Sequence, residues 1–152
     1  YNKQQIIMKT ELKKILSISG EKGLFVHLAQ GKSGIIVESL ETKARKSFGI
    51  SSKITSLADI SIYTDEEDVA LQQVFEKMAA QLNGEAAPNQ KSDPKVLKAF
   101  FDKALPTYDR DRFYTSHMKK VVEWYNILRE FASLDFVDEE SEELNQEENT
   151  QE

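Results

Sequence analysis

The sequence predicts an α+β protein in which a small, curled antiparallel β-barrel of the SH3-like type precedes a connecting helix and a C-terminal helical hairpin. Two observations support this fold class. Apolar residues alternate as in β-strands up to residue 63, whereas from residue 64 they recur at helical spacing. Towards its end the chain becomes acidic and rich in Asn and Gln, which predicts a disordered acidic tail over residues 137–152.

Short strands separated by turns fill the predicted barrel domain, residues 8–64. The expected strands are 12–18, 24–28, 35–40, 44–48 and 59–63. Gly31 and Gly34 lie in the turn between the second and third strands, so these two strands form a hairpin. Several short strands in so short a stretch favour a closed barrel, and a flat meander gives the same pattern.

A connecting helix packed on the barrel is expected over residues 65–84. Thr64 and Glu67 have the spacing of a capping box, and the acidic run 65–68 would complement the positive end of the helix dipole. The alternative reading of this run is a divalent-cation site, but the glycine spacing of an EF-hand is missing. Asn83-Gly84 supplies a stop signal for the helix.

A helical hairpin domain is expected over residues 93–136, after a linker over residues 85–92 that has no apolar pattern. Asp93-Pro94 suits an N-cap followed by the first helical position. Pro106 ends the first helix of the hairpin. The second helix is expected from residue 115 or 116 to about residue 134.

The composition argues against several classes of protein. The chain has no cysteine, so it has neither a disulfide framework nor a thiolate nucleophile, and a reducing, cytoplasmic location is expected. No apolar run reaches the length of a membrane span, so no membrane contact is expected. The net charge of −6 is segregated: residues 1–63 carry ten basic and five acidic side chains, while residues 138–152 carry eight acidic and no basic ones.

Four segments of the chain resemble a family of bacterial proteins of unknown function. They are Lys14-Ile-Leu-Ser-Ile-Ser-Gly20, Gly34-Ile-Ile-Val-Glu-Ser-Leu40, Ser56-Leu-Ala-Asp-Ile-Ser-Ile-Tyr-Thr-Asp65, and Tyr108-Asp-Arg-Asp-Arg112 with Trp124-Tyr-Asn126. The resemblance spans roughly residues 9–134. It implies a cytoplasmic bacterial protein with an N-terminal β domain and a C-terminal helical domain. It implies no known activity and no catalytic residue.

Motifs that would carry catalysis are missing. His27 and His117 are far apart and have no neighbouring ligand pattern, so no metal site is expected. Gly31-Lys32-Ser33-Gly34 lacks the upstream glycine and the following helix of a phosphate-binding loop, and a hairpin turn explains it. No nucleophile elbow occurs. The sequence therefore predicts no catalytic residue, no metal and no cofactor.

A charged loop with aromatic neighbours is the first candidate binding site. It contains Asp109, Arg110, Asp111 and Arg112, and Tyr114 follows them. Arginines in such a loop can pair with carboxylates or phosphates of a ligand. They can equally tie the loop to neighbouring helices or to the β domain, so both interpretations stay open.

A basic patch in the β domain is the second candidate. It contains Lys43, Arg45 and Lys46, and Lys32 and Lys53 could extend it. Small barrels bind single-stranded nucleic acid by combining such charge with stacking aromatics. The N-terminal third contributes few aromatic residues, which favours an ordinary solvated face.

These observations together predict a non-enzymatic interaction protein that binds a protein partner. The first alternative is RNA or DNA binding through the basic β domain, for which a steep loss of affinity with salt would be diagnostic. The second alternative is an enzyme of undetected class with its site at the Asp109–Arg112 loop.

Overall fold

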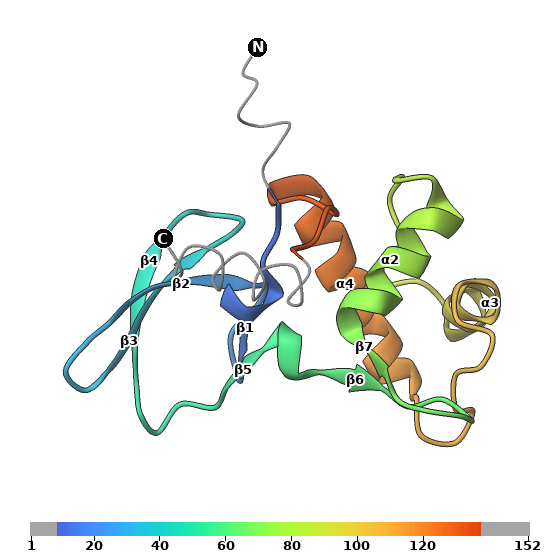
Figure 1. The fold of residues 1–152 in the computed structure, drawn as a ribbon, viewed down its shortest axis with the longest axis horizontal. Coiled ribbons are helices and arrows are strands. Elements are labelled where there is room, and N and C mark those ends of the chain that lie inside the picture. Colours follow the sequence, from blue (N-terminus) through green and yellow to red (C-terminus); the bar gives the residue numbers. More distant parts are fainter. Residues whose placement is uncertain (1–8, 138–152) are drawn as a thin grey trace, which may run out of the picture.

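A five-stranded antiparallel sheet lies beside a body of helices in the computed structural model, which describes residues 9–137 (Figure 1). The sheet strands are β1 (Ile15–Ile18), β2 (Phe25–Gln30), β3 (Gly34–Ser39), β4 (Arg45–Gly49) and β5 (Ile54–Ser56). Two short strands, β6 (Ser61–Ile62) and β7 (Val69–Ala70), form a separate ribbon. The helices are α2 (Leu71–Leu82), α3 (Pro94–Ala104) and α4 (Thr115–Phe131), with short 3₁₀ turns η1 (Leu12–Lys14) and η2 (Leu57–Asp59).

The sheet is open, so the SH3-like barrel predicted from the sequence is wrong. The strand order is β4-β3-β2-β1-β5, and within residues 9–137 the edge strands β4 and β5 do not pair with each other. A closed barrel needs alternating interior side chains from every strand. Strand β4 offers only Phe48 as a partly buried apolar side chain, since the rest of it is Arg45, Lys46, Ser47 and Gly49. It therefore remains an edge.

The two faces of the sheet pack differently. Leu16, Ile18, Phe25 and Val37 are buried on one face, where Phe48 meets Phe25 edge-to-face. The other face joins the large core. This core unites Leu12, Ile15, Leu24 and Leu57 with Leu71, Val74, Phe75 and Met78 of α2 and with Leu97, Phe101, Tyr125 and Leu128 of α3 and α4. The sheet and the helices thus share one hydrophobic core.

The predicted start of the connecting helix is also wrong. Helix α2 begins at Leu71 with Ala70 as its N-cap, because Val69 and Ala70 pair with Ile62 and Ser61 instead of joining the helix. The Thr64 hydroxyl accepts from the Glu66 N–H and donates to the Glu67 carbonyl. These bonds close a turn between β6 and β7. The acidic run 65–68 therefore does not cap a helix.

Other local signals lead to the expected structure. Asn83 ends α2 in the left-handed conformation with φ 53°. The Asp93 carboxylate accepts from the Lys95 N–H at 2.9 Å, and Pro94 is the first residue of α3. Helix α3 stops before Pro106. Helix α4 starts at Thr115 as expected, with Tyr114 as its N-cap, and ends at Phe131, a little earlier than predicted.

The strand boundaries are less accurate than the helix boundaries. Residues 12–14 form η1, so that only 15–18 is a strand, and the candidate strand 59–63 shrinks to β6. Strand β5 was not predicted, and it pairs with β1. Gly34 in the β2–β3 hairpin lies so close to the Phe48 carbonyl that a Cβ would not fit there.

Both ends of the described chain meet. The Val137 N–H donates to the Thr10 carbonyl at 3.0 Å, and the Thr10 N–H donates to the Asp135 carbonyl at 2.8 Å. The predicted disordered tail lies outside the described residues, apart from residue 137. No helix among residues 9–137 is long and apolar enough to cross a membrane.

Candidate functional site

The charged loop between α3 and α4 is anchored to residues 63–65, which directly follow β6. The Asp109 N–H donates to the Tyr63 carbonyl at 3.0 Å, and the Asp65 N–H donates to the Thr107 carbonyl at 2.8 Å. These bonds flank an antiparallel bridge between Thr64 and Tyr108. Residues 63–65, which are far from the loop in the sequence, thus hold the loop in place.

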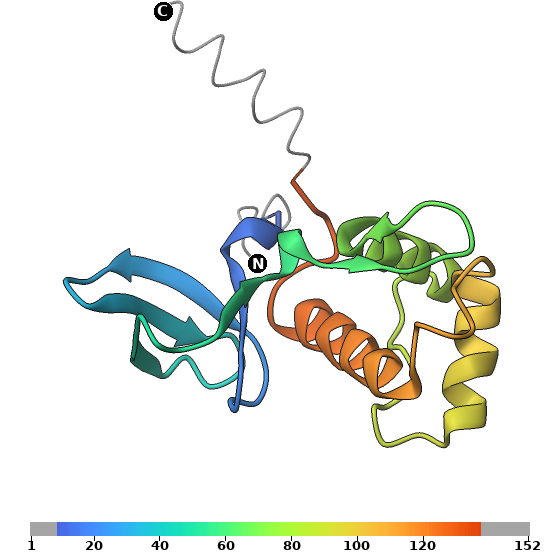
Figure 2. The ribbon, with the colours of Figure 1, turned by 90° about the horizontal axis from the view of Figure 1, so that it is seen from below.

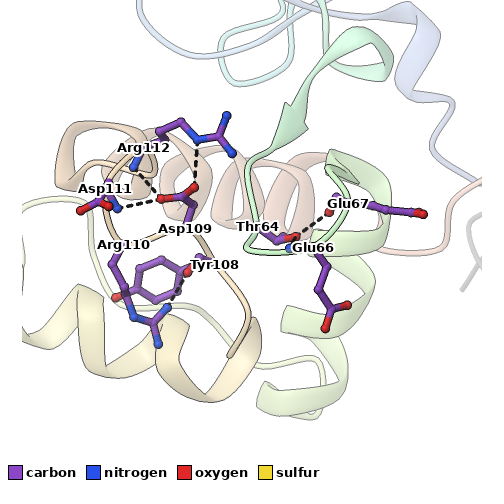
Figure 3. Close-up of polar contacts among 8 residues, drawn as sticks. All are labelled: Thr64, Glu66, Glu67, Tyr108, Asp109, Arg110, Asp111 and Arg112. Carbon is purple, nitrogen blue, oxygen red and sulfur yellow. Dashed lines mark hydrogen bonds and ion pairs between the residues drawn. The ribbon is translucent and has the colours of Figure 1, made fainter.

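Asp109 organises the loop internally (Figure 3). Its Oδ1 accepts from the Asp111 and Arg112 backbone N–H groups at 2.8 and 3.1 Å, and its Oδ2 accepts from the Arg112 Nε at 2.8 Å. The Arg112 side chain, and after it the Asp111 N–H, lower the pKa of Asp109, because both bonds favour the carboxylate. Asp109 therefore stays ionised and fixes the position of Arg112.

Arg110 and Arg112 extend to opposite sides of the loop (Figure 3). Arg110 donates to the Tyr108 and Pro106 carbonyls at 2.7 and 3.2 Å and pairs with Asp102 of α3 at 3.1 Å. Its guanidinium lies 3.6 Å from the centre of the Tyr108 ring. All four contacts lie within the fold, so Arg110 ties the loop to the end of α3.

Arg112 has a different environment. Its guanidinium lies 4.3 Å from the centre of the Tyr63 ring, and Tyr63 is 44% exposed. Cations stack favourably on tyrosine in this range. Arg112 therefore stands beside an exposed aromatic side chain that lines a groove.

This groove, here called the β6–α4 groove, has a volume of about 270 Å³. Its lining comes from β6 with its neighbouring residues and from the N-terminal part of α4; Figure 2 shows these elements from below, with β6 in green and α4 in orange. Among the lining side chains, Ile62, Phe113 and Val121 are buried and form the floor, while Tyr63, His117 and Lys120 are exposed. The full lining comprises Ile60, Ser61, Ile62, Tyr63, Phe113, His117, Lys120, Val121 and Trp124.

Helical geometry explains the α4 wall. His117, Lys120, Val121 and Trp124 are spaced three or four residues apart, so they share one face of the helix. At the start of α4, the Tyr114 N–H donates to His117 Nδ1 at 3.3 Å, and the two rings lie 5.2 Å apart. Tyr114 is 58% exposed, so it extends the aromatic surface beyond the groove.

The basic patch predicted in the β domain does not assemble on one face. Arg45 and Lys46 are successive residues of β4, and successive strand residues point to opposite faces. Arg45 pairs with Glu38 at 3.4 Å and Lys46 with Glu21 at 2.9 Å. Lys43 lies in the β3–β4 turn with φ 65°, whereas Lys32 lies in the β2–β3 turn at the other end of β3 and Lys53 precedes β5.

Within residues 9–137, no group of three or more His, Asp or Glu side chains is placed to hold a metal ion. His27 lies in β2 and His117 at the start of α4.

Sequence reasoning found part of this site and missed part. It singled out Arg112 and Tyr114, which the structure places beside the β6–α4 groove, but it missed Tyr63, His117, Lys120 and Trp124. The helical spacing of the last three, next to the buried stripe of α4, was the available signal. Nothing in the sequence marked Tyr63 as their neighbour.

Comparisons with known proteins agree with the architecture. Residues 12–57 match a domain of unknown function, DUF5606, and residues 60–128 match a second domain of unknown function, DUF6852. The chain is similar to a protein from Bacteroides vulgatus with a solution NMR structure, at 40% identity and a TM-score of 0.67. That match covers 84% of this chain and 97% of the Bacteroides chain. The comparison with curated proteins finds no match. As the sequence resemblance implied, the chain belongs to a family of bacterial proteins of unknown function that includes this Bacteroides protein.

Proposed function

We propose that this protein is a non-enzymatic interaction protein that binds a protein partner through the β6–α4 groove. The observation that supports the proposal most is the set of exposed and half-buried aromatic side chains around an apolar floor. Aromatic residues are enriched in the cores of protein interfaces, where they supply large contact areas.

The size of the groove favours a macromolecular ligand over a small molecule. Small-molecule and cofactor sites usually enclose about 300–1,000 Å³. The β6–α4 groove, at about 270 Å³, lies at the lower limit of that range. It suits one or two side chains of a partner, whose remaining contacts spread over Tyr114 and the neighbouring surface.

The groove walls are fixed before a ligand arrives. Tyr63 lies against Arg112, which Asp109 holds, and the loop backbone is bonded to the strand on both sides of Thr64. A preordered aromatic side chain loses little conformational entropy on binding, so more of the contact energy becomes affinity.

A protein ligand has better support than nucleic acid. Arg45 and Lys46 already have acidic partners, Glu38 and Glu21. They also point to opposite faces of β4, so a phosphate backbone could not follow them as one surface. The lack of cysteine is consistent with an interaction in a reducing compartment such as the cytoplasm.

Trp124 provides a direct test, because it is the only tryptophan in the chain and lines the groove. Short random peptides displayed on phage would be selected on the full-length protein and then resynthesised. We expect the selected peptides to change the Trp124 emission, and we expect Tyr63→Ala and His117→Ala to weaken their binding about tenfold or more, as is typical of interface anchors.

Ile50→Ala is the matched control, since Ile50 is an apolar side chain that is 91% exposed, follows β4 and does not line the groove. It should leave binding unchanged. Failure to obtain any peptide whose binding alters the Trp124 emission and depends on Tyr63 would reject the proposed function.

A further inference from the structure

The two edges of the segment 60–65, which contains β6, are used differently. The Ile60 carbonyl accepts from the Leu71 N–H at 2.9 Å, and the register pairs Ser61 with Ala70 and Ile62 with Val69. In an antiparallel ladder, successive residues direct their N–H and C=O groups to opposite edges. Ile60 and Ile62 therefore bond towards β7, and the backbone groups of Ser61 and Tyr63 point to the other edge.

That other edge is only partly covered. The Tyr63 carbonyl is taken by the Asp109 N–H, but the bridge between Thr64 and Tyr108 is isolated and does not continue towards Ser61. The chain turns away there, because Asp109 closes a turn onto Asp111 and Arg112. In the described part of the chain, no hydrogen bond from another segment reaches this side of the Ser61 backbone.

Ser61 and Tyr63 also line the β6–α4 groove, so the open part of this edge borders a groove whose far wall is a helix. An exposed strand edge beside an apolar groove is the arrangement that captures extended peptides by strand addition. The added backbone pairs with the edge about 4.8 Å away, and its alternate side chains point into the groove.

The charge of the groove favours an acidic ligand. Lys120 lines it, is exposed and has no ion-pair partner among residues 9–137. The guanidinium of Arg112 lies at its border on Tyr63 but is already paired with Asp109, so Lys120 supplies the unpaired positive charge. Complementary charge guides encounter and fixes register, so an acidic side chain facing Lys120 would set the position of a bound strand.

Building on the function proposed above, we infer that the β6–α4 groove binds an extended, acidic peptide segment of a partner protein. The segment adds as a strand to the Ser61–Tyr63 edge, inserts an apolar side chain over Phe113, Val121 and Trp124, and places a carboxylate against Lys120.

The first experiment tests strand addition with the phage-selected peptides, using Trp124 emission of the full-length protein as the readout. Each backbone amide of a peptide is N-methylated in turn, which removes one donor without changing the side chains. We expect methylation of the one amide that faces the Ser61 carbonyl to weaken binding about tenfold and methylation of the adjacent amides to have little effect, because the Tyr63 carbonyl already accepts from the Asp109 N–H.

The second experiment tests charge. Lys120→Glu should lower the affinity for acidic peptides about tenfold, and replacing the peptide's acidic residue by lysine should restore binding to that variant. Lys119→Glu is the matched control, because it makes the same charge change on the same helix at a residue that does not line the groove.

The outcomes separate the inference from the proposed function. Peptides that change the Trp124 emission but tolerate every N-methylation, or that bind as helices by circular dichroism, would overturn strand addition while leaving the groove as a protein-binding site. Equal effects of Lys119→Glu and Lys120→Glu would overturn the acidic contact. Peptides that leave Trp124 unaffected would overturn the proposed function itself.

Discussion

The guanidinium of Arg112 lies 4.3 Å from the centre of the Tyr63 ring, although 48 positions separate the two residues in the sequence. The contact joins the α3–α4 loop to the strand that borders the β6–α4 groove. It therefore couples the charged loop, which the sequence analysis identified as a candidate site, to an aromatic surface that the sequence did not predict.

Replacing Arg112 with alanine should weaken peptide binding while leaving the melting temperature almost unchanged. The side chain is half-exposed, so its ion pair with Asp109 stabilises the fold little. Loss of the stacking contact leaves Tyr63 free to rotate, which increases the entropy lost on binding. Thermal melts together with Trp124 titrations check this, and a large fall in melting temperature would contradict it.

The Asp109→Asn substitution should lower the melting temperature slightly at neutral pH but not in acid. The Arg112 side chain and the Asp111 N–H hold the pKa of Asp109 below its ordinary value. Such a carboxyl stabilises the fold above its unfolded pKa of about 4, and this contribution is lost as the pH falls through the lower folded pKa. Melting temperatures of both proteins from neutral pH to about pH 2 test this. A difference that persists undiminished in acid would argue against it.

Arg110→Ala should destabilise the protein more than Asp102→Asn. The first substitution removes the bonds to the Tyr108 and Pro106 carbonyls as well as the ion pair, and we expect it to lower the free energy of unfolding by about 1 kcal/mol. The second removes only a half-exposed ion pair, and we expect it to lower the free energy of unfolding by about a few tenths of a kcal/mol. Urea unfolding of both variants measures the difference, and equal losses would show that the carbonyl bonds contribute nothing.

Unfolding of the sheet and the helices should be a single cooperative transition. Leu24 in the β1–β2 connection and Val74 in α2 are both fully buried in the same core. We expect Leu24→Ala and Val74→Ala each to shift the whole transition, with Leu24→Ala costing about 2–5 kcal/mol. Differential scanning calorimetry checks this. Two separate transitions, with each substitution affecting one of them, would show that the two parts fold independently.

Truncation gives a complementary prediction about the same core. A fragment that ends at residue 64 lacks Leu71, Phe75 and Met78, which belong to the same buried core as Leu12 and Leu57 of the N-terminal part. It should be much less stable than a fragment that ends at residue 84, because so small a domain buries too little apolar surface by itself. Equal melting temperatures of the two fragments would refute this dependence.

Signals confined to a few neighbouring residues predicted the structure well. Asp93-Pro94, Asn83 and Pro106 act through their own backbone, so their effects on α2 and α3 are as expected. The Thr64 hydroxyl also makes local hydrogen bonds, but such bonds can close a turn as well as cap a helix. Here the pairing of Val69 and Ala70 with β6 leads to a turn. That pairing is a tertiary contact, which propensity cannot supply.

Features that depend on distant contacts were not predictable from the sequence alone. Barrel closure depends on whether β4 and β5 meet, and the pattern of each strand does not specify its neighbour. The β6–α4 groove brings together Tyr63, Phe113 and Trp124, which no sequence spacing connects. The loop was recognised because its unusual residues are contiguous.

The pairing of Thr10 with the segment around Phe136 has a mechanical consequence. The two segments run parallel at an isolated bridge, so a pull on both ends of the fold drags them in opposite directions along the chain. The bonds that Thr10 donates to Ser133 and Asp135, and the bond that it accepts from the Val137 N–H, are then loaded together and not broken one after another. The junction where the chain enters and leaves the fold thus acts as a shear clamp, and it shields the core from tension applied through the flanking sequence.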